Sequence, residues 1–273
     1  MSDRSELDEL LALAQRAARR GADALLAHVP AQGTIRSETK GRRRELVTAA
    51  DRAAESAVVG ELLAARPDDA VLAEEGVLTP AGRASRAARD TWIVDPLDGT
   101  TNYVHGLPWY CVAVALYRDG RPLVGVVHAP RLGHEWCAVH GRGATKDGLP
   151  ITVSATAELA DALLSTGFSY VRDEPGRDDN VERIRAVLPR CRDLRRYGSA
   201  ELDLCLCADG TVDGYWELYL QPYDVAAGAL IVREAGGRVT DLCGGEDWLH
   251  GGQLLATNGR LHAEVLAAVG GPP

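Results

Sequence analysis

The feature that most constrains the fold of this chain is a change of hydrophobic period near residue 70. Before that point, residues 5–29 and 48–65 carry apolar side chains at helical spacing, and Thr48 with Asp51 forms the pattern of an N-terminal capping box. After it come short runs rich in β-branched and aromatic residues, at 70–73, 91–94, 110–117, 122–128 and 135–139. These patterns predict two helices packed on an antiparallel sheet.

The second half of the chain mixes both patterns. Strands are expected at 162–166, 214–217, 238–241 and 253–256, and helices at 179–188, 199–208, 225–235 and 261–269. We therefore predict an α/β fold, an alternating α-β-α-β-α sandwich. Its antiparallel sheet belongs to an N-terminal half (about 1–154) and a mixed sheet with crossover helices to a C-terminal half (about 155–273). No linker rich in Pro, Gly or Ser separates the halves, so residues 1–273 are expected to form one compact unit.

Composition and charge exclude several classes of partner. The 30 Lys and Arg residues are outnumbered by 39 Asp and Glu, and the net charge of −9 disfavours binding to nucleic acid or to an anionic membrane surface. The apolar runs are far shorter than the roughly 20 residues that a membrane-spanning helix needs. The chain starts with acidic residues, whereas a signal peptide starts with basic and then apolar ones. We expect a cytoplasmic protein without nucleic-acid or membrane partners.

Two carboxylates, Asp95 and Asp98, follow a predicted strand and precede a Gly99-Thr100-Thr101 turn. Pro96 and Gly99 favour the sharp bend that would bring both carboxylates together. Crowded carboxylates with no His or Cys nearby in the sequence are the oxygen ligands that Mg²⁺ prefers. The amides of the turn would suit a phosphate group if they open a helix. The alternative is an ordinary turn with no metal.

The other notable residues each have two interpretations. Glu74 belongs to a Glu-Glu pair at a predicted strand end, which is either a metal site or a solvated surface pair. Asp51 and Asp224 lie where helices begin, so each can be a helix cap. Lysine is nearly absent from the chain, and Lys40 and Lys146 are therefore candidates for a chemical role.

The residues around these acids match a known family. Residues 92–108, WIVDPLDGTTNYVHGLP, closely resemble the first signature of the inositol monophosphatase family of metal-dependent phosphatases. YDVAAG at 223–228 with EAGG at 234–237 resembles the second signature, although Trp is commoner than Tyr223 in the family. Shorter matches follow the family's order at 46–51, 74–75, 141–148, 198–200 and 256–258. The resemblance covers about residues 40–258.

The resemblance implies a site for two or three Mg²⁺ ions. Glu74, Asp95 and the Leu97 carbonyl would hold one ion, and Asp95, Asp98 and Asp224 would hold a second. A third and weaker ion would bind near Glu74. Most of these ligands come from the N-terminal half, and Asp224 comes from the C-terminal half.

The resemblance also implies a mechanism. Thr100 and Asp51 would orient and deprotonate the attacking water, with Lys40 beside the metal site. Paired ions of this kind activate water for in-line attack on a phosphate monoester and stabilise the departing oxygen. Inhibition by lithium and a homodimeric assembly are implied as well.

The substrate contacts implied by the resemblance are Asp98, Gly99, Thr100, Gly198, Ser199, Ala200, Glu217 and Asp224. A carboxylate at Glu217 would favour a polyol such as myo-inositol monophosphate, and it could equally accept the amine of histidinol phosphate. The alternatives are thus a histidinol-phosphate phosphatase or a sugar or nucleotide phosphatase of the fructose bisphosphatase type. A different class is a non-catalytic regulator that binds a partner protein. Such a regulator would be expected to have lost an acidic ligand, and every acidic candidate is present.

Overall fold

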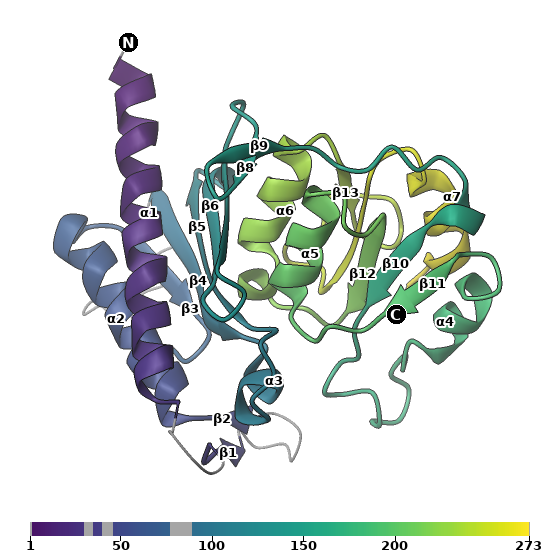
Figure 1. Ribbon diagram of the computed structural model, residues 1–273, viewed down its shortest axis with the longest axis horizontal. Coiled ribbons are helices and arrows are strands. Elements are labelled where there is room, and N and C mark those ends of the chain that lie inside the picture. Colours follow the sequence, from purple (N-terminus) through teal and green to yellow (C-terminus); the bar gives the residue numbers. More distant parts are fainter. Residues whose placement is uncertain (1, 30–34, 40–45, 77–88, 273) are drawn as a thin grey trace.

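The computed structural model describes residues 2–29, 35–39, 46–76 and 89–272, and its helices and sheets alternate in layers (Figure 1). The N-terminal half begins with α1 (Ser2–Ala27), the short strands β1 (Glu38–Thr39) and β2 (Leu46–Val47), and α2 (Ala49–Ala65). It continues with β3 (Ala70–Ala73), β4 (Asp90–Asp98), α3 (Thr100–Val104), β5 (Cys111–Arg118), β6 (Arg121–Ala129), β7 (His134–Val139), β8 (Ala144–Lys146) and β9 (Leu149–Ile151).

The C-terminal half contains the remaining elements. These are η1 (Leu159–Asp161), β10 (Leu163–Thr166), α4 (Val181–Val187), β11 (Asp193–Arg195), α5 (Ala200–Ala208), β12 (Gly214–Leu218), η2 (Pro222–Asp224), α6 (Ala226–Glu234), β13 (Arg238–Thr240), β14 (Gln253–Thr257) and α7 (His262–Val269). The predicted helices and strands of both halves are confirmed to within a few residues. The short strands β1, β2, β8, β9 and β11 were not predicted, because two or three residues carry no readable period.

Two sheets organise the molecule. Seven strands form one sheet in the order β3-β4-β5-β6-β7-β8-β9, and five form the other in the order β11-β10-β12-β14-β13. The smaller sheet is mixed, as predicted, with β10 parallel to both of its neighbours and β14 antiparallel to β12 and β13. The larger sheet is antiparallel except at its edge, where β3 runs parallel to β4. The prediction of a fully antiparallel sheet is wrong at this strand, because the long connection from β3 to β4 returns the chain to the same end.

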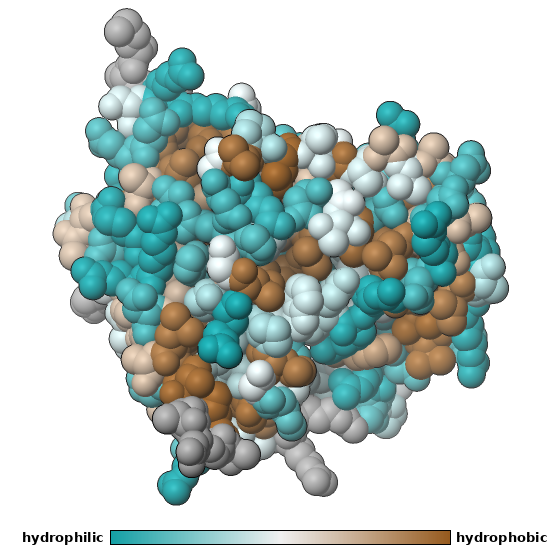
Figure 2. Space-filling model, in the orientation of Figure 1, coloured by the Kyte–Doolittle hydropathy of each residue, from teal (hydrophilic) through white to brown (hydrophobic). Residues whose placement is uncertain are grey.

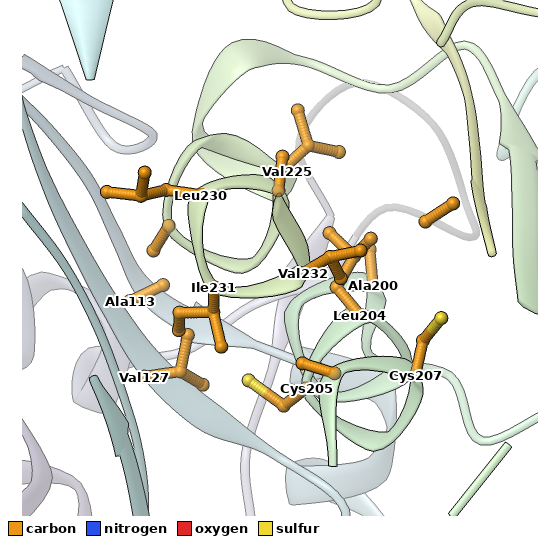
Figure 3. Close-up of a cluster of buried hydrophobic side chains, with 14 of the residues drawn as sticks. Ala113, Val127, Ala200, Leu204, Cys205, Cys207, Val225, Leu230, Ile231 and Val232 are labelled. Carbon is orange, nitrogen blue, oxygen red and sulfur yellow. The ribbon is translucent and has the colours of Figure 1, made fainter. Parts of the chain in front are cut away.

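Three hydrophobic clusters give the layer order. Helices α1 and α2 pack together on one face of the seven-stranded sheet, and α5 and α6 lie between the two sheets (Figure 1). The third cluster joins the outer face of the five-stranded sheet to α4 and α7. Figure 3 shows the middle layer, in which Cys205 of α5 and Ile231 of α6 lie beside Val127 of the larger sheet. The predicted α-β-α-β-α sandwich is confirmed.

The outer surface carries a few exposed hydrophobic side chains. Exposed large hydrophobic side chains include Leu26 and Val29 near the end of α1 and Leu107 after α3. Figure 2 shows hydrophobic residues gathered in the lower left of that view, the region of these elements in Figure 1. Within the described residues, every helix is too short or too polar to cross a membrane.

Candidate active site

The carboxyl end of β4 brings the two predicted carboxylates together. The pairing of β4 with β5 shifts its register between Asp95 and Asp98, so a bulge interrupts the alternation of side chains there. The Leu97 amide donates to Asp95 Oδ1 at 3.0 Å within this bulge. Gly99 then has φ +98°, and a Cβ at this position would lie 2.7 Å from the Trp109 carbonyl oxygen. Only glycine suits this turn, which opens α3 at Thr100 and so meets the condition set for a phosphate-binding turn.

Four carboxylates from three segments of the chain converge at this point. Asp95 is buried at the end of β4, and burial raises its pKa well above the usual value, with further contributions from Glu74, Asp98 and Asp224. Burial likewise raises the pKa of Asp98, although hydrogen bonds from Ser199 and from backbone amides oppose this. Burial also raises the pKa of Asp224, and Glu74 and Asp98 add to the effect. Mutual repulsion of this kind identifies a place where bound cations would be stabilised.

Asp51 caps α2 and also contacts Thr100. Its Oδ2 accepts hydrogen bonds from the Thr48 amide at 2.8 Å and the Thr48 hydroxyl at 2.5 Å, which completes the predicted capping box of α2. Its Oδ1 lies 3.2 Å from Thr100 Oγ1, and that hydroxyl also lies 3.2 Å from the Leu97 carbonyl oxygen. Asp51 is fully buried and Thr100 nearly so. The helix cap therefore orients the same carboxylate toward Thr100.

Asp98 connects β4 to the C-terminal half. Its Oδ2 accepts hydrogen bonds from the Ser199 hydroxyl at 2.6 Å and from the Glu201 amide at 2.7 Å, at the N-terminus of α5. Gly198, before this helix, has φ +86°, and a Cβ there would lie 2.3 Å from a nitrogen of Arg196. The predicted substrate residues Gly198, Ser199 and Ala200 thus lie beside Asp98 because α5 begins against it.

Glu217 is partly buried on β12. Its Oε2 accepts a hydrogen bond from the Tyr215 hydroxyl at 2.6 Å. Burial raises the pKa of Glu217 to about 7, and the Tyr215 hydrogen bond and Arg196 oppose the increase. A Cβ at Gly167 would lie 1.7 Å from Glu217 Oε2, so this glycine leaves the space that the carboxylate occupies.

Asp224 and Glu74 reach the site from opposite halves. Asp224 Oδ2 accepts from the Gln221 amide at 2.6 Å, within η2, whereas α6 begins at Ala226 after Val225. Asp224 therefore does not cap α6, contrary to the alternative drawn from the sequence. Beside Glu74, the Glu75 amide donates to Glu55 Oε2 of α2 at 2.7 Å. This hydrogen bond holds the predicted Glu-Glu pair against the rest of the fold.

Two cavities meet at these residues. One of about 110 Å³ is lined by seven of the predicted substrate contacts, namely Asp98, Gly99, Gly198, Ser199, Ala200, Glu217 and Asp224. The other, of about 390 Å³, is lined by Glu74, Thr100 and Asp224 among others. Both cavities include Tyr170 and Asp224, so they adjoin at these residues, with Asp98 lining the smaller cavity and Glu74 the larger.

The two lysines of the chain, Lys40 and Lys146, were candidates for a chemical role. Lys40 falls outside the described residues. Lys146 donates from Nζ to Asp209 Oδ2 at 2.8 Å and lies 4.8 Å from the centre of the Trp136 ring. Its contacts are structural, and the scarcity of lysine did not indicate a chemical role at this position.

Glu201 was missed by sequence reasoning. It is fully buried in α5, and burial together with the Asp98 charge raises its pKa to about 8. No local signal distinguishes it from other acidic residues in the first turn of a helix. Its hydrogen-bond partners are 26 and 27 residues away in sequence, so only the fold brings them together.

The donor set fits Mg²⁺. The candidate ligands are carboxylate and carbonyl oxygens, the ligands of a hard divalent cation, and the crowded charges would be neutralised by such ions. In the part of the chain that the structure describes, no three His, Cys, Asp or Glu side chains are already arranged around one metal position. The fit to Mg²⁺ therefore rests on the oxygen chemistry of the candidate ligands and on the crowding of their carboxylates.

These features place the protein among layered α/β proteins that have an acidic candidate metal site, in which every candidate ligand atom is an oxygen. A model of the inositol monophosphatase family matches residues 6–271. The inositol-1-monophosphatase of Synechocystis is 43% identical over 239 residues, which are 86% of this chain and 80% of the relative. Nus factor SuhB of Pseudomonas aeruginosa is 36% identical over 264 residues, 96% of each chain.

Solved structures agree with these matches. The inositol monophosphatase from Anabaena (Nostoc) superposes with a TM-score of 0.86 at 36% identity, covering 96% of both chains. The extragenic suppressor protein suhB from Bartonella henselae gives a TM-score of 0.88 at 34% identity, covering 96% of this chain and 98% of that one. The chain therefore belongs to the inositol monophosphatase family, whose members include phosphatases.

Proposed function

We propose that the protein is a Mg²⁺-dependent phosphatase that hydrolyses a small phosphate monoester, with myo-inositol monophosphate as the preferred substrate. The observation that carries this proposal is the convergence of Glu74, Asp95, Asp98 and Asp224 beside the Thr100–Asp51 pair. Glu74, Asp95 and the Leu97 carbonyl would hold one ion, and Asp95, Asp98 and Asp224 a second. A third ion near Glu74 completes the proposal.

The bound ions would supply positive charge for the phosphoryl oxygens and for the departing oxygen. The chain's own residues do the rest. Thr100 Oγ1, which lies 3.2 Å from Asp51 Oδ1, would accept a hydrogen bond from the attacking water and orient it. Asp51 Oδ1 receives the proton relayed through Thr100, while Thr48 keeps the other carboxylate oxygen fixed. The amides of the Gly99–Thr100 turn, at the start of α3, would bind the phosphate.

The smaller cavity is proposed to hold the alcohol. Glu217 would accept hydrogen bonds from ring hydroxyls, and Ser199 and Ala200 would contact the ring from the start of α5. A neighbouring Arg196 also lines this cavity. The same carboxylate suits the amine of histidinol phosphate, and a sugar or nucleotide phosphate remains an alternative substrate.

A non-catalytic regulatory role is the second candidate. It is favoured by the match over 96% of the chain to a relative named as a Nus factor. The net charge of −9 still predicts no direct binding to nucleic acid, so a protein partner would be expected for this role. The presence of all four acidic ligands and of the Thr100–Asp51 pair supports the enzyme.

The proposal also covers the domain organisation, the place of Lys40, the assembly and the location of the protein. Residues 1–273 would act as one phosphatase unit, because one hydrophobic cluster contains side chains from both the 1–154 and the 155–273 halves. Lys40 is proposed to lie beside the metal site, on the strength of the sequence resemblance. A homodimer, a cytoplasmic location and inhibition by lithium stay predictions.

Phosphate release from a panel of monoesters tests this function directly. The panel contains inositol, histidinol, fructose and adenosine phosphates, each assayed with Mg²⁺, with a chelator, and with Mg²⁺ restored. We expect release that disappears with the chelator, returns with Mg²⁺ and is fastest for inositol monophosphate. Release that persists in metal-free protein would contradict the mechanism, and release from none of the esters would favour the regulatory role.

A further inference from the structure

Helix α6 has no cap of its own. The residue at its N-terminal boundary is Val225, whose side chain has no oxygen to accept a hydrogen bond from the first amides of the helix. Glu201 of α5 takes that place. Its Oε1 accepts from the Ala227 amide at 3.1 Å and its Oε2 from the Gly228 amide at 2.5 Å. One helix thus caps the next across the middle layer.

The backbone of the same residue is held by a candidate metal ligand. The Glu201 amide donates to Asp98 Oδ2 at 2.7 Å, and Ser199 Oγ donates to the same oxygen at 2.6 Å. Asp98 therefore caps α5, and α5 caps α6 through Glu201. Helix α6 begins two residues after Asp224. The two caps, Asp98 on α5 and Glu201 on α6, therefore connect the candidate ligands Asp98 and Asp224.

Close packing leaves Glu201 little freedom to move. Its side chain is fully buried, and a Cβ on Gly228 would lie 2.6 Å from both Glu201 Oε2 and Leu204 Cβ. Figure 3 shows the two helices side by side, with Leu204 of α5 beside Val232 of α6. A glycine at position 228 is thus needed for the carboxylate to reach the helix end.

We propose that Glu201 is a positioning residue, which fixes Asp98 and Asp224 relative to each other for a Mg²⁺ ion that both would bind. The inference rests on the proposed function. Glu201 touches neither substrate nor metal in this scheme, and its effect passes through the two helix starts. Groups that orient metal ligands in this indirect way typically contribute about 10- to 100-fold to metal affinity or activity.

The chain offers a matched control at the other end of α6. Glu234 Oε1 accepts from the Gly141 amide at 2.8 Å, and its Oε2 accepts from the Gly143 amide at 2.9 Å. The chemistry is the same, a glutamate that holds two backbone amides of another segment. Neither of those amides belongs to the candidate site, so Glu234→Gln reports the cost of losing such a contact for stability alone.

The experiment compares Glu201→Gln, Glu201→Ala and Glu234→Gln with the wild-type protein. Titration calorimetry measures binding of Mg²⁺ alone, thermal melting measures stability without metal, and kinetics at rising Mg²⁺ measure the activation constant. We expect Glu201→Gln to weaken Mg²⁺ binding about 10-fold and to recover most of its kcat at saturating Mg²⁺. Glu201→Ala should be weaker still, and Glu234→Gln should bind Mg²⁺ as the wild type does.

Two results would overturn the inference. One is wild-type Mg²⁺ affinity in Glu201→Gln, and the other is equal loss of affinity in Glu201→Gln and Glu234→Gln. If Glu201→Ala does not fold, Glu201→Gln, which keeps the side-chain size, still decides the question. Failure of the proposed function looks different, because wild-type protein would then neither bind Mg²⁺ nor release phosphate.

Discussion

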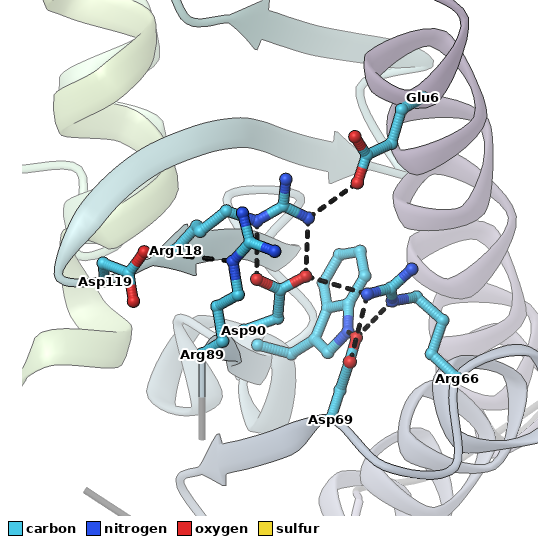
Figure 4. A network of polar contacts seen from close by, with 8 residues as sticks. Glu6, Arg66, Asp69, Arg89, Asp90, Arg118 and Asp119 are labelled. Carbon is cyan, nitrogen blue, oxygen red and sulfur yellow. Dashed lines mark hydrogen bonds and ion pairs between the residues drawn. The ribbon is translucent and has the colours of Figure 1, made fainter. Parts of the chain in front are cut away.

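The two ends of strand β4 use carboxylates in opposite ways. At its start, Asp90 accepts hydrogen bonds from Arg118 Nε and Nη2, both at 2.7 Å, and from Arg66 Nη2 at 2.8 Å (Figure 4). At its end lie Asp95 and Asp98, and within the described residues neither forms an ion pair with an Arg or Lys.

The electrostatic outcome differs accordingly. Hydrogen bonding to Arg118 lowers the pKa of Asp90, although burial opposes this, whereas burial and neighbouring carboxylates raise the pKa of Asp95. The paired end joins α1, α2 and β5 through Glu6, Arg66 and Arg118. At the crowded end, burial and neighbouring carboxylates disfavour the ionised form of Asp95, and the packing of the surrounding layers holds it there. We infer that the paired end serves stability and the crowded end serves cation binding.

The largest expected effect is that of Asp95→Asn. Because Asp95 would touch both ions, we expect kcat/KM to fall by about 10⁴-fold or more, since bound ions contribute several kcal/mol to transition-state stabilisation. Stability without metal should stay equal or rise, because one charge leaves a repulsive cluster. Steady-state kinetics and melting with and without Mg²⁺ check both points. An active Asp95→Asn enzyme would remove the distinction between the two ends of β4.

The next effect concerns the proton relay. Asp51→Asn should lower kcat by about 10²–10⁴-fold with little change in KM, since a base acts in the transition state. It should cost at most about 1 kcal/mol of stability, because Asn caps a helix nearly as well as Asp. Thr100→Ala should lose a similar factor, and the double variant should be scarcely worse than either single one. A stable Asp51→Asn enzyme with normal kcat would leave Asp51 as a helix cap only.

Asp90→Asn, at the paired end of β4, should affect stability and not activity. It should lower the free energy of unfolding by about 2–3 kcal/mol, because Arg118 and Arg66 lose a buried charged partner. Its kcat/KM at 25 °C should stay near that of the wild type. Urea unfolding beside kinetics measures both quantities. A large loss of activity in a folded Asp90→Asn protein would show that the two ends are coupled.

Glu217→Gln tests whether Glu217 contacts the alcohol part of the substrate. The variant should cost about 1–3 kcal/mol in transition-state stabilisation for the preferred substrate, the range for a hydrogen bond to a charged group. A small generic phosphate ester, which has no ring hydroxyls, serves as the control and should be hydrolysed as by the wild type. Equal losses on both esters would mean that Glu217 supports the site without contacting the alcohol.

The smallest expected effect is a pH dependence. The pKa of Asp90 in the folded protein lies below its ordinary value of 3.8, so its stabilising contribution is present above that value. The contribution is lost as the pH falls through the folded-state pKa. Unfolding in urea at pH 5 and pH 3 should therefore show a shallower decrease for Asp90→Asn than for the wild type. Parallel curves for the two proteins would contradict the lowered pKa.

Local sequence signals predicted much of this fold. Thr48 and Asp51 form the predicted capping box, and Asp119-Gly120 forms the two-residue turn between β5 and β6, with positive φ at both residues. The Asp95–Asp98 bend follows from Pro96 and Gly99 in the same way. Each of these features involves residues a few positions apart, so the chain itself contains the whole interaction.

Long-range contacts could not be predicted in this way. The parallel edge strand β3 depends on how its connection crosses the sheet, and the Glu55 hydrogen bond to the Glu75 amide spans 20 residues. Asp224 looks like the cap of α6 in sequence, yet it holds the Gln221 amide. The cap of α6 is instead Glu201, which no pattern around Asp224 indicates.

The helices, the longer strands and the acidic motifs can be read from the sequence, because periodicity, caps and turns are set by neighbouring residues. Which acids meet depends on the packing of distant segments. Asp98 reaches the start of α5 across 101 residues through Ser199, and Asp51 reaches Thr100 across 49. Burial between the packed layers, which no single segment can produce, raises the pKa values of Asp95 and Asp98 and so distinguishes a candidate metal site from a set of turns.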